Sequence, residues 1–588
     1  MGIELIKLIR SRISYLAVLG AVLFLVLQVM SDLYLPTVTS NIIDKGIAQN
    51  NIGYIWQEGF KMILVSFLGV AAAGGNIFFA ATQSMKMGQK IRDDMFDKVT
   101  HFSEADMNRF GAASLDTRTT NDVVQIQNVM VQILRMMLMA PFMLIGASTM
   151  AFVKSPRLTI IFLITLPVIA LIVGVLMYYV VPLFKVLQKK TDRINLIFGE
   201  TLTGVRTIRS FNQDHYENRR FDAANKDFAN TGIRAFTIVS FIIPIVTIVF
   251  SFINVAIIWF GGQMVSNQSL AVGNLVAFMT YSGQILFSFM MLSMIFVFLP
   301  RASASATRIN EVLSVKDTIT DPAIPVDFPV QQSGTLSFEH VYFRYSNAEQ
   351  QTLQDINFSA HAGQTVAIIG GTGSGKSTLI NLIPRLFDPE SGVVKINGVP
   401  VNQLTQHDLH EQISINQQQA ILFAGTIREN MHYAKPDATD DEIWYALTIA
   451  QATEFITTEN GGLDYHVEQN GDNFSGGQKQ RLAIARTILK PAEIYIFDDS
   501  FSALDFETDA KLRMALKNDP QIKKAITVIV AQRISTVADA DLIIVLDDCK
   551  ISGIGSHKEL AASNAVYQEI LSSQIGQGGG MNNANTTD

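Results

Sequence analysis

The sequence has little charge and almost no cysteine. Only 16% of its 588 residues are charged and 48% are hydrophobic, whereas soluble proteins average about 25% charged residues. The single cysteine, Cys549, excludes a disulfide-stapled domain, and the hydrophobic content excludes a disordered chain. Residues 1–313 carry 26 Lys+Arg against 18 Asp+Glu, while residues 314–588 carry 19 against 34. This composition predicts a membrane half and an acidic soluble half, with no nucleic acid as partner.

Long apolar runs dominate residues 1–313. Six of them reach the ~20 residues that cross a bilayer as a helix, and buried soluble-core helices are the less favoured alternative. Lys and Arg concentrate in residues 1–13, 84–130 and 185–235, which places the N-terminus and these connections in the cytosol. The predicted spans are Ser14–Pro36, Phe60–Gln83, Val131–Val153, Leu158–Phe184, Phe236–Gln263 and Leu275–Leu299.

The two long cytosolic connections contain few Gly or Pro and are predicted to extend the spans as helices, with flexible polar loops as the alternative. The chain is expected to reverse near Ser114–Asp122, where Asn121 and Asp122 are possible caps, and near Phe211–Arg219. The short outer turn Lys154–Arg157 predicts a tight hairpin between the third and fourth spans.

The spans contain few ionisable residues, and Asp32 and Arg135 are expected near span ends. This disfavours an ion-gradient mechanism and favours large or apolar cargo. Met and Phe cluster in the third and sixth spans, and such soft side chains suit a pocket for varied apolar ligands. Lipid-facing or helix-packing surface is the alternative. The candidate pocket residues are Met139, Phe287, Met291 and Met294.

Residues 314–334 contain three prolines and no apolar periodicity, as expected of a linker. From residue 335 to 576, short β-rich runs alternate with helical ones, which predicts an α/β domain with a partly parallel sheet. The expected strands include Thr335–Phe338, Gln364–Ile369, Val393–Ile396 and Ile494–Phe497. The tail 577–588 is predicted to be disordered.

The strongest motif is the run GGTGSGKS from Gly370 to Ser377, which matches G-x-x-x-x-G-K-[ST] between a predicted strand and a predicted helix. Glycine N–H groups and the helix N-terminus bind phosphates. Lys376 is predicted to contact the β- and γ-phosphates, and Ser377 to ligate Mg²⁺. The ATP-binding residues predicted here are Gly371, Thr372, Gly373, Ser374, Gly375, Lys376, Ser377 and Thr378.

A second apolar strand ends in Asp498, a position suited to hold the Mg²⁺ shell, with a strand-end cap as the alternative. A Ser-Gly-Gly run precedes it and opens a helical segment. This run resembles the signature motif of ATP-binding cassette (ABC) transporters, and the whole chain resembles an ABC exporter half-transporter. The signature residues are Phe474, Ser475, Gly476, Gly477 and Gln478.

The resemblance implies an α-helical membrane domain followed by an α/β P-loop cassette that uses ATP and Mg²⁺. Tyr345 resembles the aromatic residue that stacks on adenine, and Gln418 resembles the glutamine that contacts Mg²⁺ together with Ser377 and Asp498. The two reversal segments resemble helices that couple the membrane domain to the cassettes. The D-loop of the family is matched by Ser502, Ala503, Leu504 and Asp505.

Two positions depart from the family pattern. Asp499 stands where the catalytic base is normally glutamate, and Gln532 stands where the switch residue is normally histidine. Glutamine can hydrogen-bond but cannot change its protonation state. These changes predict a site that binds Mg·ATP and hydrolyses it slowly, unless both are tolerated variants with normal turnover.

The combination resembles the degenerate-site subunit of a heterodimeric bacterial multidrug exporter in the cell membrane. That resemblance implies ATP-driven export of hydrophobic or amphiphilic compounds by alternating access. It also implies a partner half-transporter with the consensus glutamate and histidine, whose nucleotide the signature of this chain would contact. The alternatives are a homodimeric lipid or peptide exporter and an ATP-gated regulatory subunit without pumping.

Overall fold

The computed structural model describes residues 2–293, 295–329, 334–345, 348–456 and 461–578. The chain forms two compact units. The first comprises Met1–Thr100 and Gly111–Val315, and the second comprises His101–Phe110 and Lys316–Asp588.

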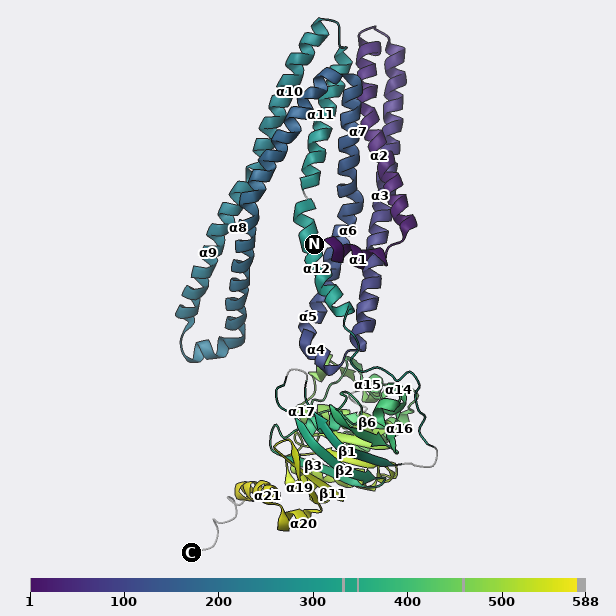
Figure 1. Ribbon diagram of the computed structural model, residues 1–588, viewed down its shortest axis with the longest axis vertical. Coiled ribbons are helices and arrows are strands. Elements are labelled where there is room, and N and C mark those ends of the chain that lie inside the picture. Colours follow the sequence, from purple (N-terminus) through teal and green to yellow (C-terminus); the bar gives the residue numbers. More distant parts are fainter. Residues whose placement is uncertain (1, 294, 330–333, 346–347, 457–460, 579–588) are drawn as a thin grey trace. The chain divides into compact units, whose positions relative to one another are not determined.

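The first unit is entirely helical among its described residues (Figure 1). Short π-helical turns, labelled η1 to η3, interrupt some of its long helices. In chain order the elements are α1 (Gly2–Arg10), α2 (Tyr15–Asn41), η1 (Ile42–Ile47), α3 (Ile52–Thr100), α5 (Ala112–Thr117), η2 (Arg118–Asp122), α6 (Val123–Gln132), η3 (Ile133–Met137), α7 (Leu138–Lys154), α8 (Pro156–Ser210), α9 (Asp214–Ser240), α10 (Ile242–Ser266), α11 (Val272–Ser293) and α12 (Ile295–Leu313).

Six helical segments of this unit are long and apolar enough to cross a membrane, which confirms the predicted helical membrane domain. The predicted tight hairpin is also correct, because Ser155 alone separates α7 from α8. The Ser155 hydroxyl accepts a hydrogen bond from the Leu158 N–H, and Pro156 occupies the first helical position. The six segments are Tyr15–Ile47, Ile52–Thr100, Ala112–Lys154, Pro156–Ser210, Asp214–Ser266 and Val272–Leu292.

The second cytosolic connection is helical, as predicted. The 55 residues of α8 extend about 80 Å at 1.5 Å per residue. α9 returns alongside α8, and the two form an arm that diverges from the other helices of this unit (Figure 1). The chain reverses at residues 211–213, so only the beginning of the predicted segment Phe211–Arg219 is a turn.

The first reversal was predicted in the wrong place. The chain turns around α4 (Glu104–Phe110), between Ser103 and Gly111, whose φ is +73°. The predicted segment Ser114–Asp122 is helical instead, in α5 and η2. Asp122 caps no helix through its side chain, because its carboxylate accepts hydrogen bonds from Ser305 (2.8 Å) and Arg308 (2.7 Å) on α12. Its polar side chain therefore joins two helices.

The second unit is built around a six-stranded sheet in the order β12-β11-β3-β10-β9-β6, with a four-stranded sheet β2-β1-β4-β5 and the short pair β7-β8. The strands are β1 (Thr335–Phe343), β2 (Leu353–His361), β3 (Thr365–Gly370), β4 (Ser391–Ile396), β5 (Val399–Pro400), β6 (Ile413–Asn416), β7 (Gly425–Thr426), β8 (His466–Val467), β9 (Ile494–Asp498), β10 (Ile526–Val530), β11 (Leu542–Asp547) and β12 (Lys550–Gly555).

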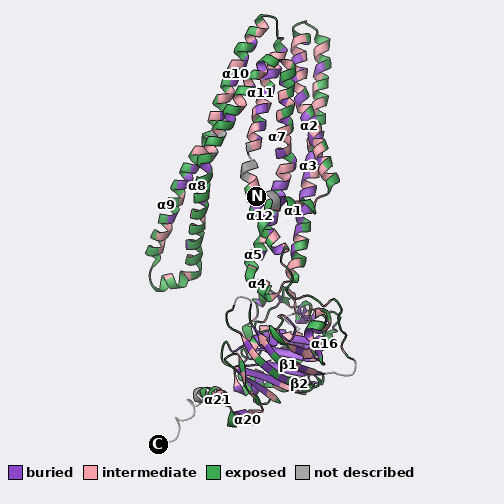
Figure 2. Cartoon of the chain, in the orientation of Figure 1, coloured by how far each residue is buried: buried purple, intermediate pink, exposed green. Residues whose placement is uncertain are grey.

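Every residue of β9 and of β10 is buried, as Figure 2 shows for the centre of this unit. Parallel strands covered on both faces read as continuous apolar runs, and this confirms the predicted α/β fold. Of the tail 577–588, which was predicted to be disordered, residues 579–588 lie outside the described residues. The helices of this unit are α4, α13 (Lys376–Asn381), α14 (Gln406–Glu411), α15 (Ile427–His432), α16 (Asp440–Ile449), α17 (Gly476–Leu489), α18 (Phe506–Asn518), α19 (Ile534–Val537), α20 (His557–Ser563) and α21 (Ala565–Gly578).

Candidate nucleotide site and transmembrane cavity

The sheet topology brings the predicted nucleotide-site segments to one edge. Strands β3, β10, β9 and β6 are consecutive neighbours and all parallel. Their carboxyl ends therefore share one edge, which is where α/β sheets bind ligands. The glycine loop follows β3, Gln418 follows β6, and Gln532 follows β10. Asp498 is the last residue of β9, and Asp499 comes directly after it.

The glycine loop has the backbone geometry that its glycines permit. Gly373 and Gly375 have φ of +82° and +97°, a region that side chains rarely allow. A Cβ on Gly375 would also lie 2.7 Å from the Thr352 carbonyl oxygen. The Lys376 ammonium donates to the carbonyls of Gly370 (2.9 Å) and Gly371 (2.6 Å), so the lysine lies along the loop.

The residues of this loop fit a magnesium nucleotide. The Ser374 hydroxyl is buried and has no hydrogen-bond partner among the described residues, as a phosphate-binding group would require. The Ser377 hydroxyl lies 3.4 Å from an Asp498 carboxylate oxygen, so two oxygen ligands of the type Mg²⁺ prefers face each other. The described part of the chain has no cluster of three His, Cys, Asp or Glu side chains that could hold a metal ion.

Electrostatics at the sheet edge follow from burial. Burial raises the pKa of the Asp498 carboxyl, and the Ser377 hydrogen bond opposes that shift. Burial likewise lowers the pKa of the Lys376 ammonium, and the charges of Asp499 and Asp498 oppose that shift. A cation and two carboxylates therefore occupy one poorly solvated edge. Gln418 is exposed in the loop after β6 and makes no hydrogen bond to Ser377 or Asp498 within the described residues.

The two departures from the family pattern contact each other. The Gln532 side-chain N–H donates to the Asp499 carboxylate at 2.9 Å. Asp499 has φ of +48°, and its N–H donates to the Val530 carbonyl (3.0 Å), which fixes the carboxylate beside β10. Burial raises the pKa of Asp499, and the hydrogen bond from Gln532 opposes that shift.

Sequence reasoning missed Gln574, which holds the switch segment from helix α21. Its side-chain N–H donates to the Gln532 carbonyl (2.8 Å), and its side-chain oxygen accepts from the Ile534 N–H (2.9 Å). The two bonds clamp the backbone on both sides of Arg533. A glutamine near the end of the chain carries no motif, so nothing in the sequence pattern indicated this role.

Tyr345 lies just after β1 and is 37% exposed. The rings of Phe343 and Phe387 lie perpendicular to its ring, with centroids 4.9 and 5.3 Å away, and its hydroxyl lies 3.0 Å from the Thr378 hydroxyl on α13. These contacts fix the ring near the helix that follows the glycine loop. Phe387 was a further contact that the sequence did not single out.

The signature run begins α17. Ser475 caps the helix, and its side chain and that of Gln478 bond each other's backbone N–H groups. Phe474 anchors the run by edge-on contacts with Phe455 and Tyr465. Among the described residues, no hydrogen bond or ion pair joins this run to the glycine loop of the same chain, and Ser475 and Gly476 at the start of the helix are exposed.

The D-loop links the signature run to the base position. An ideal Cβ on Gly477 would lie 3.2 Å from the Ala503 carbonyl oxygen, so the two segments are closely packed. The Ser502 hydroxyl donates to the Asp499 carbonyl (2.9 Å). Asp505 caps α18 by accepting from the Thr508 N–H (2.9 Å), and Leu504 is buried.

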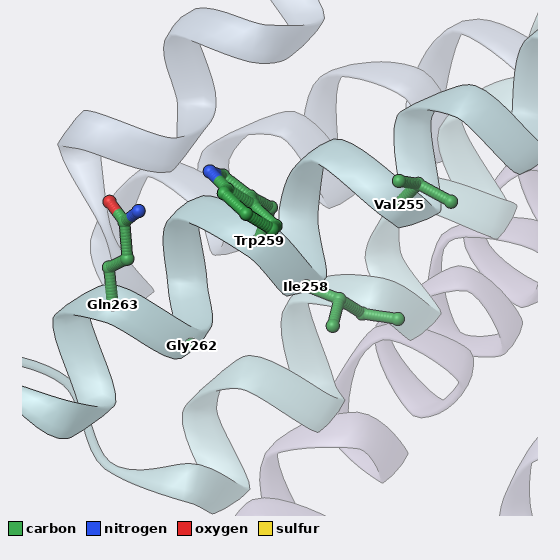
Figure 3. A pocket seen from close by; sticks show the side chains of 5 residues that line it. All are labelled: Val255, Ile258, Trp259, Gly262 and Gln263. Atoms are coloured by element: carbon green, nitrogen blue, oxygen red, sulfur yellow. The ribbon is translucent and has the colours of Figure 1, made fainter.

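Three of the four predicted pocket residues line one cavity in the transmembrane unit. Met139, Phe287 and Met291 border a space of about 390 Å³ between α2, α3, α7 and α11. Met294, the fourth, lies outside the described residues. A different hollow lies on the surface of α10 alone, where Val255, Ile258, Trp259, Gly262 and Gln263 line it without an ionisable group (Figure 3). Such an open, apolar face is typical of contact with lipid.

Comparison with known proteins identifies the family. The ABC transporter transmembrane region matches residues 18–289, and the ABC transporter ATP-binding region matches residues 353–502. An uncharacterized ABC transporter ATP-binding protein of Mycobacterium tuberculosis is 38% identical over 577 residues, covering 97% of this chain and 98% of the relative. The uncharacterized YfiB of Bacillus subtilis is 35% identical over 559 residues, covering 95% and 96%.

A further relative carries a functional name. The probable multidrug resistance ABC transporter ATP-binding/permease protein YheI of Bacillus subtilis is 35% identical over 429 residues, 73% of this chain and 72% of YheI. Among solved structures, a bacterial Atm1-family ABC exporter with ATP bound superposes with a TM-score of 0.79 over 97% of this chain and 99% of that chain, at 22% identity, which shows the fold. The chain therefore belongs to the ABC transporter family, as a multi-pass membrane protein with an exporter fold and a cytosolic ATP-binding domain.

Proposed function

We propose that this chain is the degenerate-site subunit of a heterodimeric exporter that moves hydrophobic or amphiphilic compounds out of the cell. It binds Mg·ATP in its own glycine loop, hydrolyses it slowly, and supplies an intact signature run to the nucleotide of its partner. The observation that carries this proposal is the hydrogen bond between Asp499 and Gln532.

A slow site follows from what this pair can do chemically. Hydrolysis needs a carboxylate that orients and deprotonates the attacking water and a residue that stabilises charge at the γ-phosphate. The Asp499 side chain is one methylene shorter than glutamate, and one of its oxygens already accepts from Gln532. The Gln532 amide is neutral and cannot carry a positive charge. Both requirements are therefore weakened in one site.

Nucleotide binding depends on residues that are intact. The glycine loop, Lys376, Ser377 and Asp498 keep the residue types and arrangement that bind phosphates and Mg²⁺. When bound, Mg²⁺ neutralises phosphate charge. We place Ser377, Asp498 and Gln418 around it, and the Tyr345 ring on the base.

The partner is expected to carry the consensus glutamate and histidine. Ser475 and the N-terminus of α17 are exposed, and among the described residues no hydrogen bond or ion pair joins them to the glycine loop of this chain, which supports a role toward a second nucleotide. Binding of two nucleotides between two cassettes would close them and turn the cavity outward. Hydrolysis at the partner's site would then allow the return.

The multidrug assignment is supported by the character of the cavity and by the name of YheI. Met and Phe side chains adapt to ligands of different shape. A cavity of about 390 Å³ is within the range for drug-sized molecules.

The decisive experiment compares this chain alone with this chain co-expressed with a half-transporter that carries the consensus glutamate and histidine. The purified chain alone should bind a fluorescent ATP analogue, lose that binding in Lys376→Ala, and turn over ATP at least ~100-fold more slowly than the pair. Inside-out vesicles with the pair should take up fluorescent drugs when ATP is added. Rapid turnover by the chain alone would indicate the homodimeric alternative, and ATP hydrolysis without any uptake by the pair would indicate a regulatory subunit.

A further inference from the structure

The transmembrane cavity is bordered by an acidic side chain on a membrane helix. Asp32 borders the cavity from α2. It belongs to the helical segment Tyr15–Ile47, which is long and apolar enough to cross a membrane. A carboxylate in a membrane-spanning segment is costly, and residues of this kind mark binding sites or pathways.

The described residues provide no partner for this carboxylate. Among them, the Asp32 side chain accepts no hydrogen bond and joins no ion pair, and no Lys, Arg or His lines the cavity. Gln284 on α11 bonds the backbone instead, because its side-chain N–H donates to the Asp32 main-chain carbonyl at 3.1 Å. Asp32 is thus tied to α11 through its backbone, and its carboxylate remains available.

Gln284 fixes this part of the wall. One of its side-chain N–H groups donates to the Asp32 carbonyl, and its side-chain oxygen is buried away from the cavity, without a hydrogen-bond partner in the described part of the chain. The Asp32 carboxylate is therefore the charged acceptor among the residues that line the cavity.

Most of the remaining lining is apolar and polarisable. Met139, Met143, Phe287 and Met291 border the same cavity from α7 and α11. Aromatic faces also attract cations, and thioether sulfur is polarisable. The cavity thus combines one carboxylate with a largely soft, apolar wall.

We propose that Asp32 binds the cationic head group of an amphiphilic cargo whose apolar part lies against the methionines. This rests on the proposed export function and specifies its substrate class. A cation with N–H donors satisfies the unpaired carboxylate. An anionic amphiphile would instead face a carboxylate with no lysine or arginine to offset it.

The test measures binding before transport. The purified pair in lipid nanodiscs is titrated with rhodamine 6G, a cation, and with a neutral boron-dipyrromethene dye of similar size. Asp32→Asn should weaken rhodamine 6G binding roughly 10- to 30-fold, as expected for loss of one partner of a partly buried charge pair. Binding of the neutral dye should change less than about twofold.

Two further variants keep the test decisive if Asp32→Asn folds poorly. Gln284→Glu adds a second carboxylate to the cavity lining and should tighten rhodamine 6G binding while leaving the neutral dye unaffected. Asp93→Asn removes an equal charge from an exposed position of α3 and serves as the matched control. Uptake of both dyes into inside-out vesicles should follow the same order as binding.

The outcomes separate this inference from the proposed function. Equal loss of both dyes in Asp32→Asn, together with no gain in Gln284→Glu, would overturn the cation site while leaving export in place. Failure of the wild-type pair to transport either dye would overturn the multidrug proposal. Selective loss of the cation alone in Asp32→Asn, with normal transport of the neutral dye, would support both.

Discussion

Restoring the consensus residues at the slow site is the most direct test of the chemical argument. The double variant Asp499→Glu, Gln532→His lengthens the carboxylate by one carbon–carbon bond, about 1.5 Å, and supplies an imidazole that can carry charge. In the present chain an Asp499 carboxylate oxygen lies 2.9 Å from the Gln532 side-chain nitrogen, so the shorter side chain is directed toward Gln532, which follows β10.

The expected gain follows from general-base catalysis. A base that misses its water by about 1 Å loses ~10²-fold in rate, and a positioned base contributes about 10²- to 10⁴-fold in total. The double variant should therefore raise turnover at this site by about 100-fold. Each single variant should gain less than tenfold, because residues in direct contact do not act additively.

The assay must isolate this site. In the assembled pair, the partner's own catalytic carboxylate is replaced by an amide, and hydrolysis of bound radiolabelled ATP is followed in a single turnover. Occupancy of the site is checked by photolabelling with an azido-ATP. If the double variant binds ATP normally at this site and its turnover there stays at the wild-type level, the explanation that Asp499 and Gln532 slow hydrolysis is refuted.

Three other substitutions test single contacts. Gln574→Ala removes both bonds of the clamp on the switch segment, so amide hydrogen exchange at Ile534 should accelerate roughly tenfold, while exchange in β10 should stay unchanged. Gly375→Ala introduces a Cβ where φ is +97° and a carbonyl oxygen lies 2.7 Å away, so the affinity for an ATP analogue should fall by at least about tenfold. An affinity equal to that of the wild type would contradict the loop geometry. Asp122→Asn removes the charge of a carboxylate that is 3% exposed and bonded to Arg308. It should lower the free energy of unfolding, measured in a thermal melt, by roughly 1–3 kcal/mol, which is more than Asp93→Asn should lower it.

The sequence predicted those parts of the site in which a motif encodes backbone geometry. Glycines at 373 and 375 permit the positive φ that the loop adopts, and an apolar run ending in Asp498 gives a buried parallel strand. Positions of these segments along one sheet edge then follow from the topology. The chemistry of a substitution such as Gln532 could also be read from its residue type alone.

Contacts made by unmarked side chains could not be predicted. Gln574 belongs to a final helix without a motif, yet it bonds the backbone on both sides of the switch position. Asp122 was read as a cap because its residue type favours caps, whereas a tertiary partner, Arg308, takes its carboxylate.

The contact between Asp499 and Gln532 has a consequence for the closed state of the cassettes. The Gln532 side-chain amide donates one of its two N–H groups to Asp499, and the backbone around it is held by Gln574. Its second N–H can donate to a γ-phosphate while the first keeps its bond to Asp499. A hydrogen bond from that N–H to a charged phosphate oxygen contributes about 1.5–3 kcal/mol. It favours nucleotide retention without providing a base, so the same two side chains that slow hydrolysis also stabilise bound ATP.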